Sequence, residues 1–339
     1  MEVRPRILYV LHQYPQLSET YIKTEIAALA RDYELKICVF TPPDLAYHKN
    51  VHPYVMVDSL ADLVRETEAF EPAIIHTHWL FGQLPYVLAL ARETGIPFTV
   101  RAHSFDTIWW MKTDLNNLAN MVAACNDELC LGVLAFPFNL DELVRAGIRR
   151  ANITPCWPSI DYAKFYDRSP NGEGIINLGA ALPKRQLEDY IQLAGLEPSL
   201  RFDLYAIGYT TSSIGAYNEA HGSPVIMHDA VEPDDMAPIY KAHRWLICTA
   251  SRDIAGVGWP LVIAEAQAAG LGVCMANIRP DMREFVGPHV VLYDDIAEVR
   301  SLITGPVPEV MREAGFEHAK KSDIEAHKAL LTDLWQPFL

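Results

Sequence analysis

The most informative segment of this chain is Gly256-Val-Gly-Trp-Pro-Leu-Val-Ile-Ala-Glu265-Ala-Gln-Ala-Ala-Gly270. Its glycine-rich turn leads into Pro260 at the expected first position of a helix, where the missing N–H would have no intrahelical partner anyway. The free N–H groups at such a helix end bind anions. Glu265 follows near the start of the second turn, from which a carboxylate can reach a ribose hydroxyl. The pattern indicates a nucleotide-binding segment, although glycine turns before helices also occur with a purely structural role.

Length and composition favour a globular protein of two domains. A chain of 339 residues is too long for one typical core, and 50% hydrophobic with 21% charged residues is typical of a folded protein. The formal net charge of -15 disfavours a nucleic-acid partner, because a phosphate backbone would be repelled. One basic patch, made of Arg145, Arg149 and Arg150, is better interpreted as a solvated helix end than as a contact surface for an anion.

Neither the cysteines nor the apolar segments point to secretion or to a membrane span. The six cysteines have no CxxC spacing and mostly lie in apolar runs, which is typical of buried thiols. The N-terminus lacks a charged-then-apolar signal segment, and no apolar run reaches about 18 residues. We therefore expect a cytoplasmic protein. Membrane association has no support, because no basic amphipathic helix is evident.

Short buried strands alternate with amphipathic helices along the chain, which predicts parallel sheets. In the first half, the expected strands are Arg6–Val10, Lys36–Phe40, Ile74–Thr77 and Phe98–Ala102, and the expected helices include Tyr21–Arg31 and Gln83–Glu93. In the second half, the expected strands are Ile175–Leu178, Phe202–Ile207, Val225–His228, Leu246–Thr249, Val273–Ala276 and Val290–Leu292.

The polar turn Ser169–Gly174 separates the two series and predicts a domain boundary. We expect two doubly wound, Rossmann-like α/β domains, at residues 1–168 and 169–320, and a C-terminal helix over residues 321–339 that packs across both. Open parallel sheets bind ligands beyond the carboxyl ends of their strands, so two such domains facing each other predict a central cleft.

Two histidines follow predicted strands. His103, in Arg101-Ala-His-Ser-Phe-Asp106, is expected at the carboxyl end of its strand, where an imidazole can bond a substrate hydroxyl or phosphate. Asp106 or Arg101 can set its protonation state. His78, in His76-Thr-His-Trp79, is expected at the same edge, and both histidines are also compatible with a structural role. An H-x-H pair needs further ligands to hold a metal ion, and none is identifiable, so we expect no metal.

Positive charge for a phosphate is expected from Lys184 and Arg185. They follow a turn that begins at Gly179 and precede a helix expected over Leu187–Leu193, so a phosphate would meet both side-chain charge and a helix N-terminus. An equal alternative is that Lys184 and Arg185 are exposed to solvent and bind no ligand. The chain contains no Asp-x-Asp pair that would hold a divalent ion against a diphosphate.

Two further loops belong to the predicted carboxyl edges of the sheets. Ser18 and Glu19 follow the first strand, and Ser18 is also a good N-cap for the next helix. Tyr205-Ala-Ile-Gly208 closes a strand of the second domain, where backbone groups could receive a base.

In order and spacing, these segments resemble the retaining glycosyltransferases of the GT-B fold, specifically those of family 4. The resemblance runs almost end to end, over Tyr14–Tyr21 with Glu25 and Ile26, Ile75–His78, Gly95–Pro97 with Ala102, His103 and Asp106, Pro158–Asp161 with Phe165, Gly179–Arg185, Gly258–Gly270 and Arg283–Val286. It implies transfer of a sugar from a nucleotide diphosphate sugar to a hydroxyl or amine acceptor, such as a saccharide or a small-molecule glycoside. Retention at the anomeric carbon is implied, with neither cofactor nor metal.

The resemblance also implies the roles of individual residues. Glu265 contacts the donor ribose, and the turn before its helix holds the diphosphate together with Lys184 or Arg185. The other implied donor-binding residues are Gly179, Gly208, Arg252, Gly258, Leu261 and Val262. His103 approaches the donor sugar as the catalytic residue, with Arg101 and Asp106 beside it. The implied acceptor-binding residues of the first domain are Tyr14, Ser18, Glu19, His78 and Trp79.

Two positions depart from the family pattern. A glutamate that often contacts the donor sugar is replaced by Val257, and the arginine of a frequent Gly-Arg pair is replaced by Ala180. The first change fits an unusual donor such as a deoxy sugar, a replacement by Asp253, or weakened or absent catalysis.

Competing functions and the acceptor stay open at this level. A non-catalytic nucleotide-sugar-binding partner subunit is the main competitor of an active transferase, and a nucleotide-sugar epimerase is a lesser one. Four aromatic residues are candidates for an acceptor platform or for core packing, namely Trp79, Phe81, Trp109 and Trp110.

Overall fold

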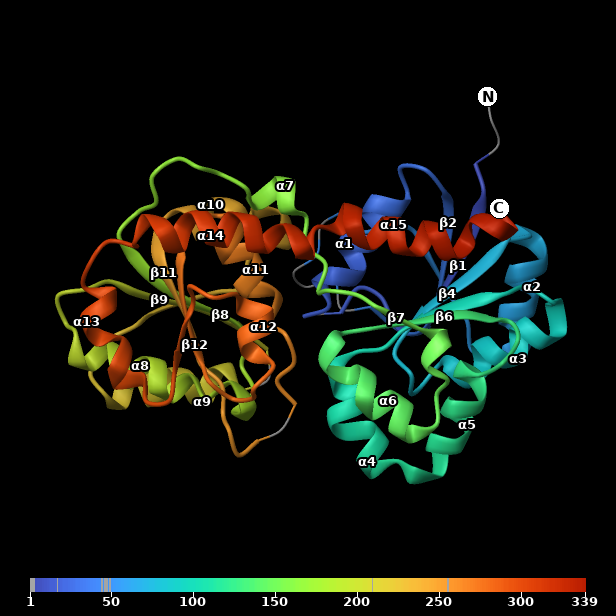
Figure 1. The fold of residues 1–339 in the computed structure, drawn as a ribbon, viewed down its shortest axis with the longest axis horizontal. Coiled ribbons are helices and arrows are strands. Elements are labelled where there is room, and N and C mark those ends of the chain that lie inside the picture. The colour runs from blue at the N-terminus through green and yellow to red at the C-terminus, as the bar shows by residue number, and fades with distance from the viewer. Residues whose placement is uncertain are drawn as a thin grey trace. The chain divides into compact units, whose positions relative to one another are not determined.

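The computed structural model describes residues 4–16, 18–43, 45, 48, 50–208, 210–254 and 256–339. The chain forms two compact units, each built around its own parallel sheet (Figure 1). Unit 1 holds the N-terminal residues up to 45, residues 50–159 and residues 324–339. Unit 2 holds residues 160–323.

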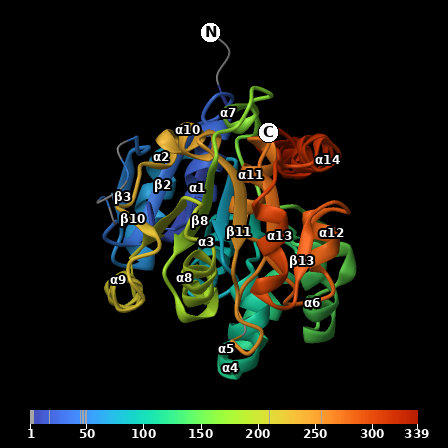
Figure 2. The same cartoon turned by 90° about the vertical axis from the view of Figure 1, so that its left-hand side faces the viewer.

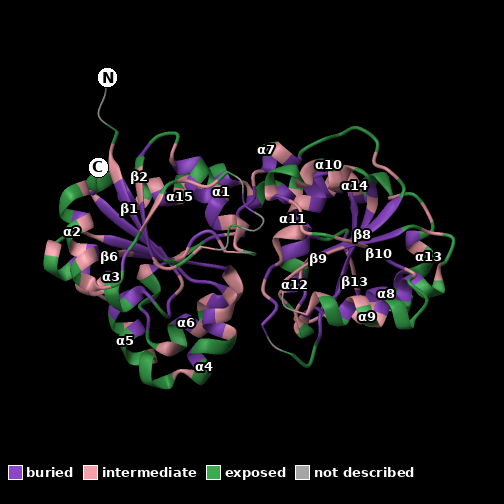
Figure 3. Cartoon of the chain, turned by 180° about the vertical axis from the view of Figure 1, so that it is seen from behind, coloured by how far each residue is buried: buried purple, intermediate pink, exposed green. Residues whose placement is uncertain are grey.

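Unit 1 contains a seven-stranded sheet with the order β3-β2-β1-β4-β5-β6-β7, in which all neighbours are parallel. Its strands are β1 (Arg6–Gln13), β2 (Glu34–Thr41), β3 (Tyr54–Met56), β4 (Ile74–His78), β5 (Phe98–Arg101), β6 (Cys130–Ala135) and β7 (Ile153–Pro155). Every residue of β4 and β5 is buried, as expected for central strands covered on both faces (Figure 3).

Helices cover both faces of this sheet. Those of unit 1 are α1 (Thr20–Leu29), α2 (Leu60–Phe70), α3 (Leu84–Thr94), α4 (Met111–Thr113), α5 (Leu115–Cys125), α6 (Leu140–Ala146) and α15 (Ile324–Trp335). Side chains of α2, α3, α5 and α6 share one apolar core with the strands. The helices α1 and α15 lie side by side, and the Trp335 indole of α15 donates a hydrogen bond to Thr99 of β5 at 3.0 Å (Figure 1).

Unit 2 contains a six-stranded parallel sheet with the order β10-β9-β8-β11-β12-β13 (Figure 2). Its strands are β8 (Gly174–Ala180), β9 (Phe202–Ile207), β10 (Ile226–His228), β11 (His243–Cys248), β12 (Gly272–Ala276) and β13 (Val291–Tyr293). Close packing at its centre requires a glycine, because a Cβ atom at Gly272 would lie 2.3 Å from a ring carbon of the fully buried Trp245.

The helices of unit 2 are α7 (Tyr162–Phe165), α8 (Leu187–Leu196), α9 (Thr211–Ala220), α10 (Met236–Lys241), α11 (Leu261–Ala268), α12 (Met282–Val286), α13 (Arg300–Ile303) and α14 (Glu309–Ala319). Side chains of α8, α9 and α13 belong to one apolar core with the strands, and α11 packs against α7 and α14. The observed architecture therefore confirms the predicted α/β fold class with two doubly wound sheets.

Every strand predicted from the sequence is present within a few residues of its expected bounds. Three strands of unit 1, β3, β6 and β7, were not predicted. Two helix starts were wrong by one position: Pro260 is the N-cap of α11, which begins at Leu261, and Glu19 is the N-cap of α1 in place of Ser18. Ser18 is exposed, and the N-cap position of α1 is occupied by the following residue, Glu19.

Unit 1 ends at Ser159, earlier than the boundary expected at residue 168. The reason is that α7 packs within unit 2, where the Tyr162 hydroxyl donates to the Phe316 carbonyl at 3.2 Å and Phe165 meets Tyr240 edge to face. The C-terminal helix α15 belongs to unit 1.

No helix in the described part of the chain has both the length and the apolar composition needed to cross a membrane.

Candidate functional site

In unit 2, the chain order reverses between β8 and β11, and open parallel sheets bind ligands at such a point. One loop leads from β8 through the short turn η4 (Pro183–Arg185) to α8, and another leads from β11 to α11. The Ser251 N–H donates to the Lys184 carbonyl at 2.9 Å, and Lys184 Nζ donates to the Gly256 carbonyl at 2.8 Å. The two loops therefore form one connected edge.

Glu265 lies in the second turn of α11, as the sequence predicted. Its Oε2 atom accepts a hydrogen bond from the Tyr240 hydroxyl at 2.5 Å. Burial raises the pKa of Glu265, while the Tyr240 hydrogen bond and the charge of Lys164 act in the opposite direction. Among the residues that the structure describes, no group bonds the other oxygen, Oε1. One carboxylate oxygen is therefore positioned by the protein and the other is available to a ligand.

At the start of α11, one turn before Glu265, the backbone N–H groups of Leu261 and Val262 make no hydrogen bond within the described part of the chain. The first N–H group of this helix that is hydrogen-bonded is that of Ile263, which donates to the Pro260 carbonyl at 3.1 Å. The N–H groups of Leu261 and Val262 come before it and point out of the helix end. Gly258 lies three residues before Leu261 and is partly exposed. This arrangement suits an anion beside the carboxylate of Glu265.

The two predicted phosphate cations differ in their surroundings. Lys184 is half-buried at the connected edge, and burial together with the charge of Arg185 lowers its pKa. Arg185 is only 9% exposed, and its Nη2 atom donates to the Leu178 carbonyl at 3.0 Å. Arg185 thus supports the loop after β8, and Lys184 is the better placed of the two to meet a phosphate.

The remaining predicted donor residues lie at or near the same edge. Gly179, the penultimate residue of β8, and Gly208, which follows β9, have φ angles of 127° and 62°, which residues with side chains rarely adopt. Arg252 is exposed on the loop after β11, where it pairs with Asp294.

One of the two departures from the family pattern, Val257, has a packing explanation. Val257 is 5% exposed and belongs to the apolar core of unit 2, so a carboxylate in this place would be buried. Asp253, the possible replacement for that carboxylate, is exposed on the same loop. Ala180, at the second departure, is the last residue of β8.

In unit 1, the order of the strands reverses between β1 and β4, and His103 lies just beyond the neighbouring strand β5. The His103 ring packs against Trp79 and Tyr21, with centroid distances of 4.3 and 4.8 Å. Trp79 has a φ of 73°, a left-handed conformation that is strained for a bulky residue, and its N–H donates to the Arg101 carbonyl at 2.8 Å. Strain of this kind concentrates at functional sites.

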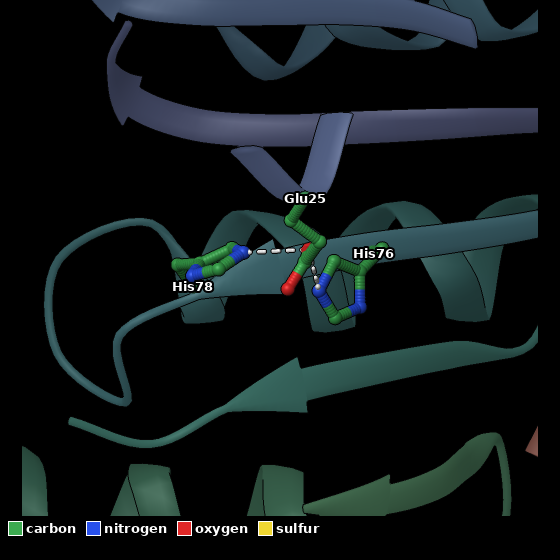
Figure 4. A group of neighbouring side chains, drawn as sticks. All are labelled: Glu25, His76 and His78. Carbon is green, nitrogen blue, oxygen red and sulfur yellow. Dashed lines mark hydrogen bonds and ion pairs between the residues drawn. The ribbon is translucent and has the colours of Figure 1, made fainter. Parts of the chain in front are cut away.

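A buried carboxylate that the sequence did not single out as a site residue lies beneath His103. Glu25 of α1 has no solvent exposure, and its Oε1 atom accepts from the Tyr9 hydroxyl at 2.8 Å and lies 3.0 Å from His78 Nε2 and 3.2 Å from His76 Nε2 (Figure 4). Its Oε2 atom lies 2.6 Å from His327 Nε2 and 3.3 Å from a guanidinium nitrogen of Arg101.

This cluster extends to His103, because His78 Nδ1 lies 3.1 Å from His103 Nε2. Burial raises the pKa of Glu25 but is outweighed by its histidine and hydrogen-bond partners, so this pKa lies well below its usual range. Burial lowers the pKa values of His78 and His327 to about 4, and burial together with the charges of His78 and Arg101 lowers the pKa of His103 well below its usual range. At neutral pH, the imidazoles of His78, His103 and His327 are therefore neutral, and they lie with the Glu25 carboxylate and the Arg101 guanidinium in one cluster.

Two carboxyl groups beside His103 have raised pKa values. Burial raises the pKa of Glu19 to about 8, against hydrogen bonds from Trp79 and Tyr21. Burial raises that of Asp106 to about 7, although its carboxyl accepts bonds from the backbone N–H groups of His103, Leu80 and Phe81. Asp106 therefore holds the loop of His103 through its backbone, with a 2.8 Å bond to the His103 N–H, rather than through the imidazole.

Three predicted site residues, His78, Tyr14 and Arg101, are almost fully buried. His78 is fully buried between Glu25 and His103, and Tyr14 is 2% exposed. Arg101 is 1% exposed and donates to Ser159 Oγ at 2.9 Å and to the Trp157 carbonyl at 3.0 Å. These contacts show that the side chains of His78 and Arg101 support the surroundings of His103, and the acceptor-binding or catalytic roles of all three residues stay predictions. Trp79 and Glu19 are half-buried beside His103, and Ser18 is exposed.

The candidate acceptor aromatics fall into two groups. Phe81 is buried and stacks on Trp110, whereas Trp109 and Trp110 are 46% and 38% exposed. Trp109 stacks on Phe105, two residues after His103, with an interplanar angle of 10°.

The ligand atoms of Glu25, His76 and His78 lie within 4.8 Å of one another, a spacing that a metal ion would also require. The surroundings do not fit a cation, because Arg101 lies against the same carboxylate and His327, Tyr9 and His78 already share its oxygens. We interpret the set as a hydrogen-bonded network.

No known protein-family profile matches this sequence, and no curated protein is detectably related to it. Solved structures with a similar fold are nevertheless found. HepE of Anabaena in complex with UDP has a TM-score of 0.76 at 15% identity, over 98% of this chain and 100% of HepE. The sucrose-phosphate synthase of Thermosynechococcus elongatus has a TM-score of 0.72 at 13% identity, over 98% and 99% of the two chains. The lipopolysaccharide outer core galactosyltransferase WaaB has a TM-score of 0.64 at 14% identity, over 97% and 99%. At these identities the likeness establishes the fold, and this chain has the GT-B fold.

Proposed function

We propose that this chain is a retaining glycosyltransferase that moves a sugar from a nucleotide diphosphate sugar to a hydroxyl or amine of a saccharide or small-molecule glycoside. Unit 2 binds the donor nucleotide, and unit 1 supplies His103 and binds the acceptor. The transfer needs no metal ion. The main support is Glu265, whose Oε1 atom is bonded by no group among the described residues and which lies one turn after the first N–H groups of α11, those of Leu261 and Val262.

This geometry suits a nucleoside diphosphate for a chemical reason. A ribose hydroxyl donates to a carboxylate oxygen, and a phosphate accepts from helix N–H groups and from Lys184. Retaining transfer depends on stabilising the charge that develops on the leaving diphosphate, which fixed donors in a partly buried site can do. HepE has been solved with UDP and with UDP-glucose, which makes UDP-sugars the first donors to test.

The decisive assay supplies candidate donors with a panel of glycosides and follows release of the nucleoside diphosphate and formation of product. We expect turnover, with the anomeric configuration of the donor preserved in the product as read by NMR. His103→Ala should reduce turnover at least about 10²-fold, whereas His289→Ala, a change at an exposed histidine of unit 2, should not. Inversion at the anomeric carbon would refute the retaining assignment.

A non-catalytic nucleotide-sugar-binding subunit is the alternative that one observation favours. Val257 packs in the core where a sugar-contacting glutamate is frequent, so this chain has one carboxylate fewer near the donor sugar. The alternative predicts nucleotide binding that depends on Glu265 without transfer by the isolated chain. Robust transfer would eliminate it.

A further inference from the structure

We propose that Glu25 and His78 are positioning residues that hold His103 as the neutral Nε2–H tautomer, so that its Nδ1 atom accepts a hydrogen bond from a substrate hydroxyl. The identity of that hydroxyl rests on the proposed function. The tautomer of His103 does not, and it can be measured without turnover.

The first step concerns the proton on His78. Glu25 is fully buried with Arg101 at 3.3 Å, and an ionised carboxylate only accepts hydrogen bonds. His78 Nε2, at 3.0 Å from Glu25 Oε1, must therefore carry a proton. Because His78 is neutral, its Nδ1 atom is unprotonated and acts as an acceptor.

The second step uses the tautomer of His78 to determine which ring nitrogen of His103 carries the proton. The bond of 3.1 Å between His78 Nδ1 and His103 Nε2 needs one donor, and His78 Nδ1 cannot supply the proton, so His103 Nε2–H donates. A neutral His103 then has a lone pair on Nδ1. No group in the described part of the chain bonds that nitrogen, while Trp79 and Tyr21 pack against the ring.

Because Arg101 lies beside Glu25, replacing one carboxylate oxygen of Glu25 by an NH₂ group, as in Glu25→Gln, tests the inference. Arg101 and His327 face Glu25 Oε2, whereas Tyr9 and His78 face Oε1. In Glu25→Gln, the amide oxygen has to face Arg101, because a guanidinium only donates. The NH₂ group then faces His78 and donates to its Nε2 atom. His78 becomes the Nδ1–H tautomer and donates to His103 Nε2, which inverts the tautomer of His103 and turns its Nδ1 atom from an acceptor into a donor.

The test uses the full chain with ¹⁵N-labelled histidine, in which NMR distinguishes protonated from unprotonated ring nitrogens and the signals of His103 are assigned by their loss in His103→Ala. We expect the Nε2–H form in the wild-type protein and the Nδ1–H form in Glu25→Gln. Tyr9→Phe is the matched control, since it removes one donor to Oε1 without breaking the path to His103. This control should keep the wild-type tautomer.

A turnover measurement adds a second readout. Glu25→Gln should lower kcat about 10²-fold or more and leave the affinity of unit 2 for the nucleotide unchanged, and a Glu25→Asp variant should recover part of kcat.

Three results would overturn the proposal. They are an Nδ1–H tautomer of His103 in the wild-type protein, an unchanged tautomer in folded Glu25→Gln, and a stoichiometric metal ion on the Nε2 atoms of His76 and His78. The wild-type spectrum decides the first even if the variant does not fold. A chain with the expected tautomers but no transferase activity would refute the proposed function and leave this network intact.

Discussion

Replacing Tyr240 by phenylalanine removes one oxygen atom from the contact that positions Glu265. Tyr240 has no solvent exposure, and its hydroxyl donates to Glu265 Oε2 at 2.5 Å. A hydrogen bond to a charged group contributes about 1.5–3 kcal/mol. We therefore expect the free energy of unfolding of unit 2 to fall by an amount of this order.

The same change should weaken nucleotide binding in a pH-dependent way. Burial already raises the pKa of Glu265, and the Tyr240 hydrogen bond opposes this shift, so its loss raises the pKa further. A protonated carboxyl is a poorer acceptor for a ribose hydroxyl. We expect Kd for the nucleotide to rise about tenfold, equivalent to about 1.4 kcal/mol, at neutral pH, and part of this loss to be recovered as the pH is raised and Glu265 ionises.

Calorimetric titration from pH 6 to 9, with thermal denaturation of the same samples, tests both effects. Tyr217→Phe is the matched control, because the Tyr217 hydroxyl bonds, among the residues that the structure describes, only Gln192, at 2.8 Å on the surface of unit 2. A Tyr240→Phe protein that loses stability but binds nucleotide like the wild type at every pH would refute the positioning of Glu265 by Tyr240.

Three further predictions concern unit 1. In wild-type protein the pKa of Asp106 is raised from 3.8 to about 7, so the free energy of unfolding falls as the pH rises through that window, whereas the Asn side chain of Asp106→Asn does not titrate. Between pH 4 and pH 7 the free energy of unfolding of the variant should therefore rise relative to wild type by up to about 4 kcal/mol. A difference between the two proteins that does not change with pH in denaturant unfolding would contradict this. Trp335→Ala removes a fully buried indole that contacts Tyr33 and Thr99. Chemical denaturation should show that the free energy of unfolding falls by about 3–5 kcal/mol. An unchanged denaturation midpoint would mean that α15 contributes little to the stability of unit 1. Dialysis against EDTA should leave both turnover and the unfolding temperature unchanged, because the positive charge of Arg101 beside Glu25 repels a cation there. A loss of activity in EDTA that added Zn²⁺ or Mg²⁺ restores would contradict this prediction.

Most of the fold was predictable because its central strands are short, continuous apolar runs. The run Phe98–Ala102 and the segment Ile74–Thr77 are buried on both sides and have no other plausible interpretation. The strands β3 and β7 are only three residues long, so pairing with a neighbour, rather than their own pattern, determines their conformation.

The candidate site was predictable where a residue follows a strand. His103 was found in this way, and Glu265 was found from the glycine-rich turn and proline before its helix, since the carboxyl ends of parallel strands and the start of the next helix lie at one edge. The burial of Arg185, His78 and Tyr14 was not predictable, because it depends on which neighbours cover them.

Glu25 was missed as a site residue for a physical reason. Its partners His78, Arg101 and His327 come from β4, β5 and α15, which are far apart in the sequence, and no local pattern brings them together. A signal did exist, since Glu25 lies between Ile22 and Ile26 on the buried face of an amphipathic helix, where a carboxylate needs partners.

The most direct test of the proposed function is calorimetric titration of UDP, GDP, ADP and dTDP into the wild-type chain and into Glu265→Gln, with Glu284→Gln, a change at an exposed glutamate of α12, as the control. We predict that one nucleoside diphosphate binds the wild type and the control, and that Glu265→Gln loses at least about tenfold in affinity, equivalent to about 1.4 kcal/mol. Absence of binding by all four nucleotides, or equal binding by Glu265→Gln, would contradict a nucleotide site at the start of α11.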